Sequence, residues 1–154
     1  MYPTDHVATA AYYRMTAVVY FESAKMLEAA FVAKGEKMPG NRMAIPYYLL
    51  ISHAAELYLK CALLKHGTTL DELKRFDVRH NLKGLLDRLI SYGVPILPRT
   101  RDLLGVLSEQ HRKHDLRYTV FVDDGIPTFT PEPSELYEML DELLLAGRIA
   151  THGI

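Results

Sequence analysis

The chain of 154 residues has a single cysteine, Cys61, and no tryptophan. One cysteine excludes an internal disulfide, which is typical of proteins from a reducing compartment. Its leucine-rich surroundings predict a small buried apolar side chain rather than a reactive thiol. The first residues lack the basic segment and uninterrupted apolar run of a signal peptide. The longest apolar stretch, residues 45–64, carries too many polar residues to prefer lipid. We therefore expect a cytoplasmic protein with no membrane contact.

The sequence also has no excess of either charge. Lys and Arg total 18, Asp and Glu total 19, and the net charge is −1. No field of the whole molecule therefore attracts nucleic acid, so binding of RNA or DNA would need a local basic patch. The hydrophobic fraction of 49% and the length fit one soluble domain with a single core. Glycine-rich phosphate loops, nucleophile elbows, zinc-protease motifs and paired cysteines do not occur, and no cofactor is expected.

Helical periodicity dominates what is present. Apolar residues recur at three-, four- and seven-residue steps, as in the stripe formed by Met15, Val19, Met26 and Ala30. Glycine, proline and capping residues divide the pattern into segments. We expect helices at about residues 7–34, 46–66, 70–75, 80–93, 101–116 and 134–147.

The period changes shortly before the last helix. YTVFV is β-branched and aromatic, Asp124-Gly125 suits a two-residue turn, and IPTFT follows. We predict a small β-hairpin at about residues 118–130, then a helix capped by Ser134, and a frayed tail at 148–154. The predicted fold is therefore all-α, one domain over residues 1–154. It is an antiparallel bundle of five to six helices with a β-hairpin before the last one.

The second expected helix contains HAAELYLKCALLKHG, in which three polar residues interrupt an apolar surface. His53, Glu56 and Lys60 are spaced by three and four, so they form one line along the helix. One interpretation is that the line faces water, where the Glu56–Lys60 pair contributes only ~0.3–0.5 kcal/mol. The other is that a helix apolar nearly all round is central, which places the line in a groove or interface. There the charges would need partners, such as Arg79, His80 or Arg117.

The same stretch, AAELYLKCALLKHG, together with RHNLKGLLDRL, resembles the HEPN domain (higher eukaryotes and prokaryotes nucleotide-binding). Members often carry A-x-E-x-x-L-K-x-x-L-x-x-x-G on one helix and H-[DN]-L-x-x-L-L at the start of another. Glu56, Lys60, His80 and Leu82 fit the family positions, and the match covers residues 54–89. The resemblance implies an antiparallel helical bundle, usually dimeric, associated with toxin–antitoxin, defence and stress systems. It also implies a nucleotide or RNA as ligand, and a cognate antitoxin or a nucleotidyltransferase-like protein as partner.

Several HEPN members are metal-independent RNases, and their signature is an arginine followed four to six positions later by a histidine on a late helix. Arg75 and His80 have this spacing, but they lie before the fourth expected helix. The late segment HRKHDLRY, residues 111–118, holds basic residues in another order; they are His111, Arg112, Lys113, His114 and Arg117. This segment would suit a phosphate-facing patch or a solvated helix end. A metal site is not expected, because the two histidines have no obvious third ligand.

Ten tyrosines are the other notable excess, and several fall on the first two expected helices. They would suit either a dimer interface or ordinary boundary packing. The leading hypothesis is a dimeric HEPN-like binding or regulatory module, with His53, Glu56, Lys60, Arg79 and Arg112 as its polar network. The first alternative is a metal-independent endoribonuclease using His80, His114 and Arg117. The second is a helical dimer that binds a protein partner and no nucleic acid.

Overall fold

The computed structural model describes residues 6–75, 81–114 and 128–148, and this part of the chain is helical. It contains α1 (His6–Ala33), the short 3-10 helix η1 (Arg42–Ala44), α2 (Ile45–His66), α3 (Leu70–Lys74), α4 (Leu82–Ser91), α5 (Pro98–His114) and α6 (Pro133–Arg148). The all-α prediction is confirmed at this level. Within the described ranges, no helix is both long enough and apolar enough to cross a lipid bilayer.

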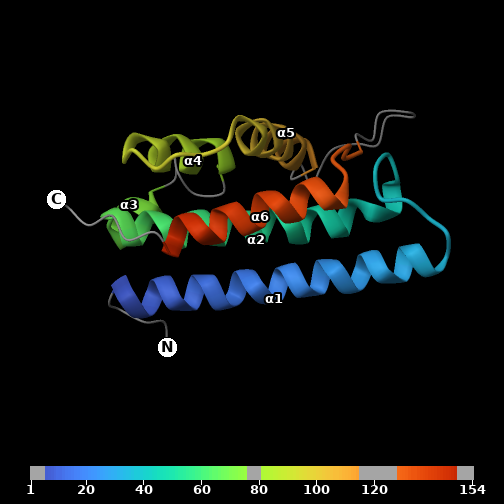
Figure 1. Ribbon diagram of the computed structural model, residues 1–154, viewed down its shortest axis with the longest axis horizontal. Coiled ribbons are helices and arrows are strands. Elements are labelled where there is room, and N and C mark those ends of the chain that lie inside the picture. The colour runs from blue at the N-terminus through green and yellow to red at the C-terminus, as the bar shows by residue number, and fades with distance from the viewer. Residues whose placement is uncertain (1–5, 76–80, 115–127, 149–154) are drawn as a thin grey trace.

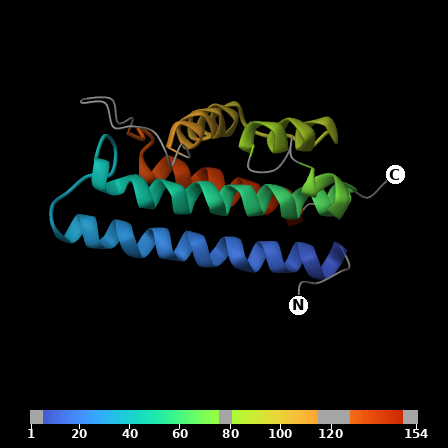
Figure 2. The same ribbon diagram turned by 180° about the vertical axis from the view of Figure 1, so that it is seen from behind.

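The helices form three layers (Figures 1 and 2). The long α1 forms one outer layer, α2 and α6 lie side by side in the middle, and α4 and α5 form the other outer layer. The helix α2 contacts α1, α4, α5 and α6, so it is central, as its nearly all-round apolarity predicts. Most residues of α2 are accordingly buried.

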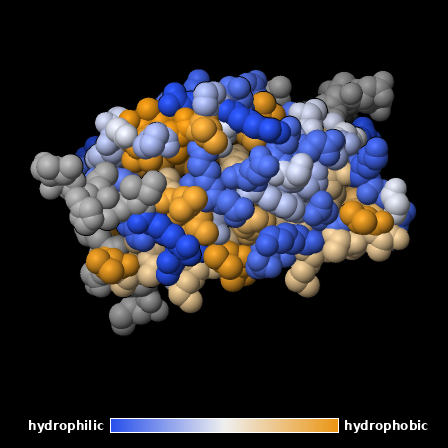
Figure 3. Space-filling model, viewed as in Figure 1, coloured by the Kyte–Doolittle hydropathy of each residue, from blue (hydrophilic) through white to orange (hydrophobic). Residues whose placement is uncertain are grey.

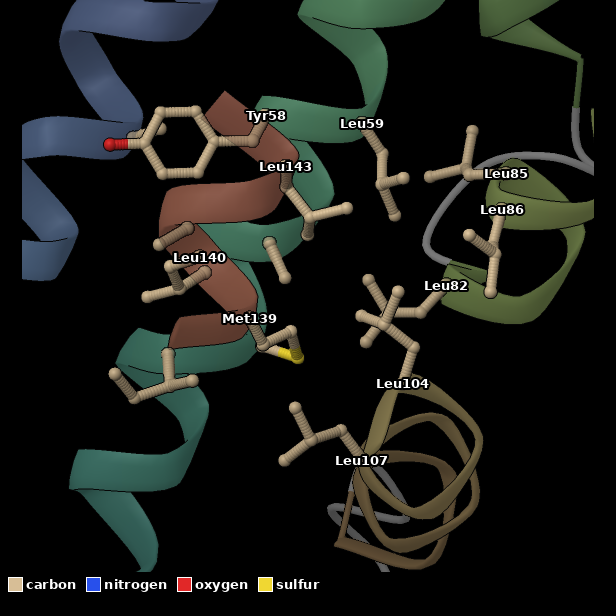
Figure 4. Packing of buried hydrophobic residues seen from close by; sticks show 14 of the residues in the cluster. Tyr58, Leu59, Leu82, Leu85, Leu86, Leu104, Leu107, Met139, Leu140 and Leu143 are labelled. Atoms are coloured by element: carbon tan, nitrogen blue, oxygen red, sulfur yellow. The ribbon is translucent and has the colours of Figure 1, made fainter. Parts of the chain in front are cut away.

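The core extends from the contact between α1 and α2, through α2 and α6, to the α4–α5 layer. The predicted apolar face of α4 is confirmed, because its leucines are buried; they are Leu82, Leu85, Leu86 and Leu89. The same holds for the inward face predicted on α6, which consists of Leu136, Met139, Leu140 and Leu143. Figure 4 shows Leu59 of α2 pointing toward Leu85 and Leu86, with Leu104 and Leu107 of α5 closing the cluster. Cys61 is buried at 3% exposure, so the predicted core role is confirmed.

Several helix ends are located where local chemistry places them. Gly67 follows α2 with φ 115°, in the left-handed region that favours glycine, and its N–H donates to the last carbonyls. The side chain of Thr69 accepts a hydrogen bond from Glu72 N at 3.1 Å. Asn81 caps α4 in the same way, accepting from Gly84 N at 3.0 Å. Each of these ends was predicted from the residue type alone.

Two helix starts differ from the prediction. The helix α5 begins at Pro98 rather than near Arg101, and α6 begins at Pro133, so Ser134 lies inside the helix and is not its N-cap. The physical reason is the same in both places. Proline lacks an N–H, but the first turn of a helix needs none, and the fixed φ of proline suits that position. Pro98 and Pro133, which in the sequence suggest an interruption of a helix, therefore begin the helices α5 and α6.

The predicted hairpin is not seen. No strand occurs in the described ranges, and residues 128–130, the end of its second arm, are irregular; residues 118–127 lie outside the described part. The carbonyl of Phe129 accepts a hydrogen bond from Gly40 N at 2.9 Å. The Phe129 ring stacks on Tyr48 with centroids 4.8 Å apart. Within the described ranges, this segment thus contacts the turn before η1 and the start of α2.

Candidate functional site

The polar line on α2 is an ion-paired cluster at the surface of the central helix. Lys60 Nζ lies 3.0 Å from Glu56 Oε1, and His53 Nδ1 lies 3.8 Å from Glu56 Oε2. The exposed fractions of the side chains are 8% for Glu56, 13% for Lys60 and 42% for His53. The acid at the centre is therefore buried, and the histidine is the member that solvent reaches most easily.

The helix α1 covers one side of this line. The His53 ring stacks on Tyr20 of α1, with centroids 5.4 Å apart and planes 28° from parallel. Burial, and after it the charge of Glu56, raises the pKa of the Tyr13 hydroxyl on α1. The line therefore lies at the boundary of α1 and α2 rather than on an open water-facing stripe. Figure 2 shows α2 between α1 and the α4–α5 layer.

The remaining predicted site residues cannot be placed beside this cluster. Arg79, His80 and Arg117 lie outside the described residues. Arg112 and His114 belong to the last turn of α5, of which only the backbone is described. The structure therefore brings together His53, Glu56 and Lys60 and leaves the other predicted members of the site as predictions.

A second polar chain, not found from the sequence, joins α1, α2 and α6. The Tyr47 hydroxyl donates to the Tyr137 hydroxyl at 3.0 Å, and Tyr137 donates to Glu28 Oε1 at 2.6 Å. Burial raises the pKa of both tyrosines well above the ordinary value. The hydrogen bond to Tyr137 adds to the shift of Tyr47, and the hydrogen bond to Glu28 adds to that of Tyr137. Nearby, Tyr48 donates to the carbonyl of Pro131 at 2.6 Å. The abundance of tyrosine in the sequence was the only signal for this polar chain. Tyr47, Tyr48 and Tyr137 all form hydrogen bonds within the one chain.

Known proteins give no further guide to the site. No family model matches the sequence, and neither does any curated protein or solved structure. In the described ranges, His, Cys, Asp and Glu side chains do not gather in groups of three or more that could hold a metal ion. The chemistry of the site therefore has to be argued from its own geometry.

Proposed function

We propose that this protein is a cytoplasmic HEPN-like binding or regulatory module, of toxin–antitoxin, defence or stress type, with a nucleotide or RNA as its ligand. The resemblance of residues 54–89 to the HEPN pattern supports the family. The observation that favours a binding module over an enzyme is the buried Glu56–Lys60 pair, whose atoms lie 3.0 Å apart. A general acid or base must reach its substrate directly or through one water. Glu56 is already ion-paired within α2 and its side chain is only 8% exposed, so we assign it a structural role in that helix rather than a catalytic one.

The accessible part of the line supports a nucleotide as ligand. His53 is 42% exposed and stacks on the half-buried Tyr20, so two planar rings meet at the edge of the cluster. Bases stack on aromatic and histidine rings whatever their sequence, and each such contact contributes about 1–3 kcal/mol. A base placed against His53 would have the charge of Lys60 seven residues, or about two helical turns, further along the same face.

Thermal unfolding with nucleotides and short single-stranded RNA tests the proposal. A ligand selective for the native state stabilises it by ~2.7 kcal/mol at one hundred times its Kd. For a chain of this length that corresponds to a rise in Tm of about 5–11 °C. His53→Ala should reduce the rise, whereas Met43→Ala, an exposed substitution in η1, should leave it unchanged. Equal melting of wild type with and without every ligand would remove nucleotides and RNA from the proposal. An antitoxin or nucleotidyltransferase-like partner would then be the remaining ligand class.

The competing endoribonuclease hypothesis is decided by a separate assay. Purified protein is incubated with labelled RNA in EDTA, beside His80→Ala and His114→Ala variants. RNA left intact by all three proteins agrees with a binding module. Cleavage by wild type that either variant abolishes would replace the binding role by a metal-independent nuclease.

A further inference from the structure

The helix α5 has no side chain of its own that caps its N-terminus. It begins at Pro98, which lacks a backbone N–H, and Leu97 before it has no side-chain oxygen to accept a hydrogen bond. The carbonyl of Leu97 accepts from Arg101 N at 3.1 Å, so Leu97 occupies the capping position. A side-chain cap for this end of α5 therefore has to come from another element.

Glu142 of α6 provides this cap. Its Oε1 accepts from Leu97 N at 2.8 Å, and its Oε2 accepts from the Thr100 hydroxyl at 2.8 Å. In a capping box, an acid three residues inside the helix accepts from the N–H of the capping residue. Thr100 holds that inside position here, and the acid lies 42 residues further along the chain, in another helix. These two hydrogen bonds, which we name the Glu142 cap, therefore also join α5 to α6.

Electrostatics adds to this contact. The carboxylate of Glu142 lies at the positive, N-terminal end of the α5 helix dipole, where a negative charge is stabilising. Glu135, seven residues earlier on the same face of α6, accepts a hydrogen bond from Arg99 at 2.5 Å. The Arg99 side chain is 59% exposed, so this ion pair contributes little. Among the described residues, the Glu142 cap is therefore the main polar contact between α5 and α6.

The rest of α5 is held by a small apolar face. Over its described side chains, residues 98–110, the buried apolar ones are three leucines; they are Leu103, Leu104 and Leu107. The helix lies in an outer layer (Figure 1), and the surface over it is mostly hydrophilic (Figure 3). Within the same residues, Gln110 Oε1 is buried without a hydrogen-bond partner, which costs free energy while α5 stays packed. A helix with few buried apolar contacts opens at a lower free energy than the whole fold.

We infer that α5 opens as a unit while the other described helices remain folded, and that the Glu142 cap controls this opening. The connection from α4 is anchored, because Val94 and Ile96 are each 4% exposed, whereas Leu97 is 64% exposed. The backbone therefore turns at Leu97 and Pro98, beside the cap.

Opening of α5 affects the predicted site as well as the fold. Arg112 and His114 belong to the last turn of α5, so both residues are displaced when the helix opens. The Glu142 cap thus regulates where these two residues lie. The opening needs no nucleotide, so the inference goes beyond the proposed function and does not depend on it.

Hydrogen exchange of the native protein without nucleic acid tests the role of the cap. Glu142→Met keeps the length of the side chain and removes both acceptor oxygens. Glu138→Met, at an exposed position of α6, is the matched control. Loss of a helix cap shifts an opening equilibrium by a factor of about 5, and up to about 30. The amides of residues 102–107 should exchange faster by that factor in Glu142→Met and at the wild-type rate in Glu138→Met. Equal rates in Glu142→Met and wild type would overturn the inference.

A substitution outside α5 tests whether the helix opens on its own. Ala17 of α1 is fully buried, and Ala17→Gly should shift the equilibrium of global unfolding by a factor of at least about 5. The slowest amides of α2 should exchange faster by that factor. The amides of α5 should keep their wild-type rates, because α1 stays folded when α5 opens. Acceleration of α5 equal to that of α2 would overturn the inference, since α5 would then exchange only by global unfolding. A protein that binds no nucleotide but shows the expected rates would retain this inference while refuting the proposed ligand.

Discussion

Replacing Glu56 by glutamine removes one charge of the buried pair while leaving its size unchanged. The same substitution at Glu22 provides a matched comparison within the same molecule. In both pairs a lysine Nζ lies 3.0 Å from a glutamate oxygen within one helix. The pairs differ in burial, since Glu56 and Lys60 are 8% and 13% exposed, whereas the Glu22 and Lys25 side chains are 61% and 43% exposed.

The expected losses follow from this difference. Removing one partner of a buried pair costs about 3–5 kcal/mol, because the other charge stays out of water without its counter-charge. Lys60 retains some access to solvent, so we expect about 3 kcal/mol for Glu56→Gln. An exposed pair within one helix contributes ~0.3–0.5 kcal/mol, so Glu22→Gln should cost no more than that. For a chain of this length the two losses correspond to about 6–12 °C and at most ~2 °C in Tm.

Urea and thermal unfolding of the four proteins of a double-mutant cycle measure the effect. The loss of stability in the double variant Glu56→Gln/Lys60→Met should be smaller than the sum of the two single losses by at least ~1 kcal/mol, because neither charge is then left unpaired. Near-equal Tm values for Glu56→Gln and Glu22→Gln would refute the view that the buried pair in α2 stabilises the fold more than the exposed pair does. Such a result would make a catalytic role for Glu56 a hypothesis again.

Three further predictions rest on the buried hydroxyls and the thiol. Burial raises the pKa of Tyr47, Tyr48 and Tyr137 well above the ordinary value for tyrosine. The unfolded chain therefore loses these protons first. Stability should be constant below about pH 10 and fall above it, with tyrosinate absorbance appearing only on unfolding; absorbance that rises before unfolding contradicts this. Tyr137→Phe leaves the buried Tyr47 hydroxyl without its acceptor and should cost about 1–3 kcal/mol in urea unfolding; a loss below ~0.5 kcal/mol would count against the chain. Burial raises the pKa of the Cys61 thiol, so a maleimide should react slowly in buffer and rapidly in denaturant; fast labelling of the folded protein would show the site to be open.

Local signals were sufficient for most helix boundaries. Gly67, Thr69 and Asn81 act through their own backbone angles or side chains, so their effect can be predicted without knowing the rest of the fold. Pro98 and Pro133 show the limit of such signals, because proline disfavours a helix interior and favours a first turn. Which of the two applies depends on what the following residues pack against.

In the candidate site too, contacts between residues near in sequence could be predicted, and contacts between distant residues could not. The Glu56–Lys60 pair follows from a four-residue spacing, and its burial follows from the apolar surroundings of α2. The hydrogen bond from Tyr137 to Glu28 joins residues 109 positions apart. No periodicity relates such residues, and only the packing of α6 against α1 and α2 brings them together.

The two faces of α1 show why periodicity alone could not decide what the helix packs against. The stripe of Met15, Val19 and Met26 repeats at helical steps, and so do the buried alanines Ala10, Ala17 and Ala24, so each set could have faced the core. Side-chain size separates them, because the alanine face lets α1 lie close to α2 while its flanking aromatic residues fill the gaps. The core of the single chain therefore does not use the side chains of Met15, Val19 and Met26, which are mostly exposed. Met26 is 74% exposed, so Met26→Glu should leave the Tm unchanged in thermal unfolding, whereas a clear loss of stability would show that Met26 is packed in the core.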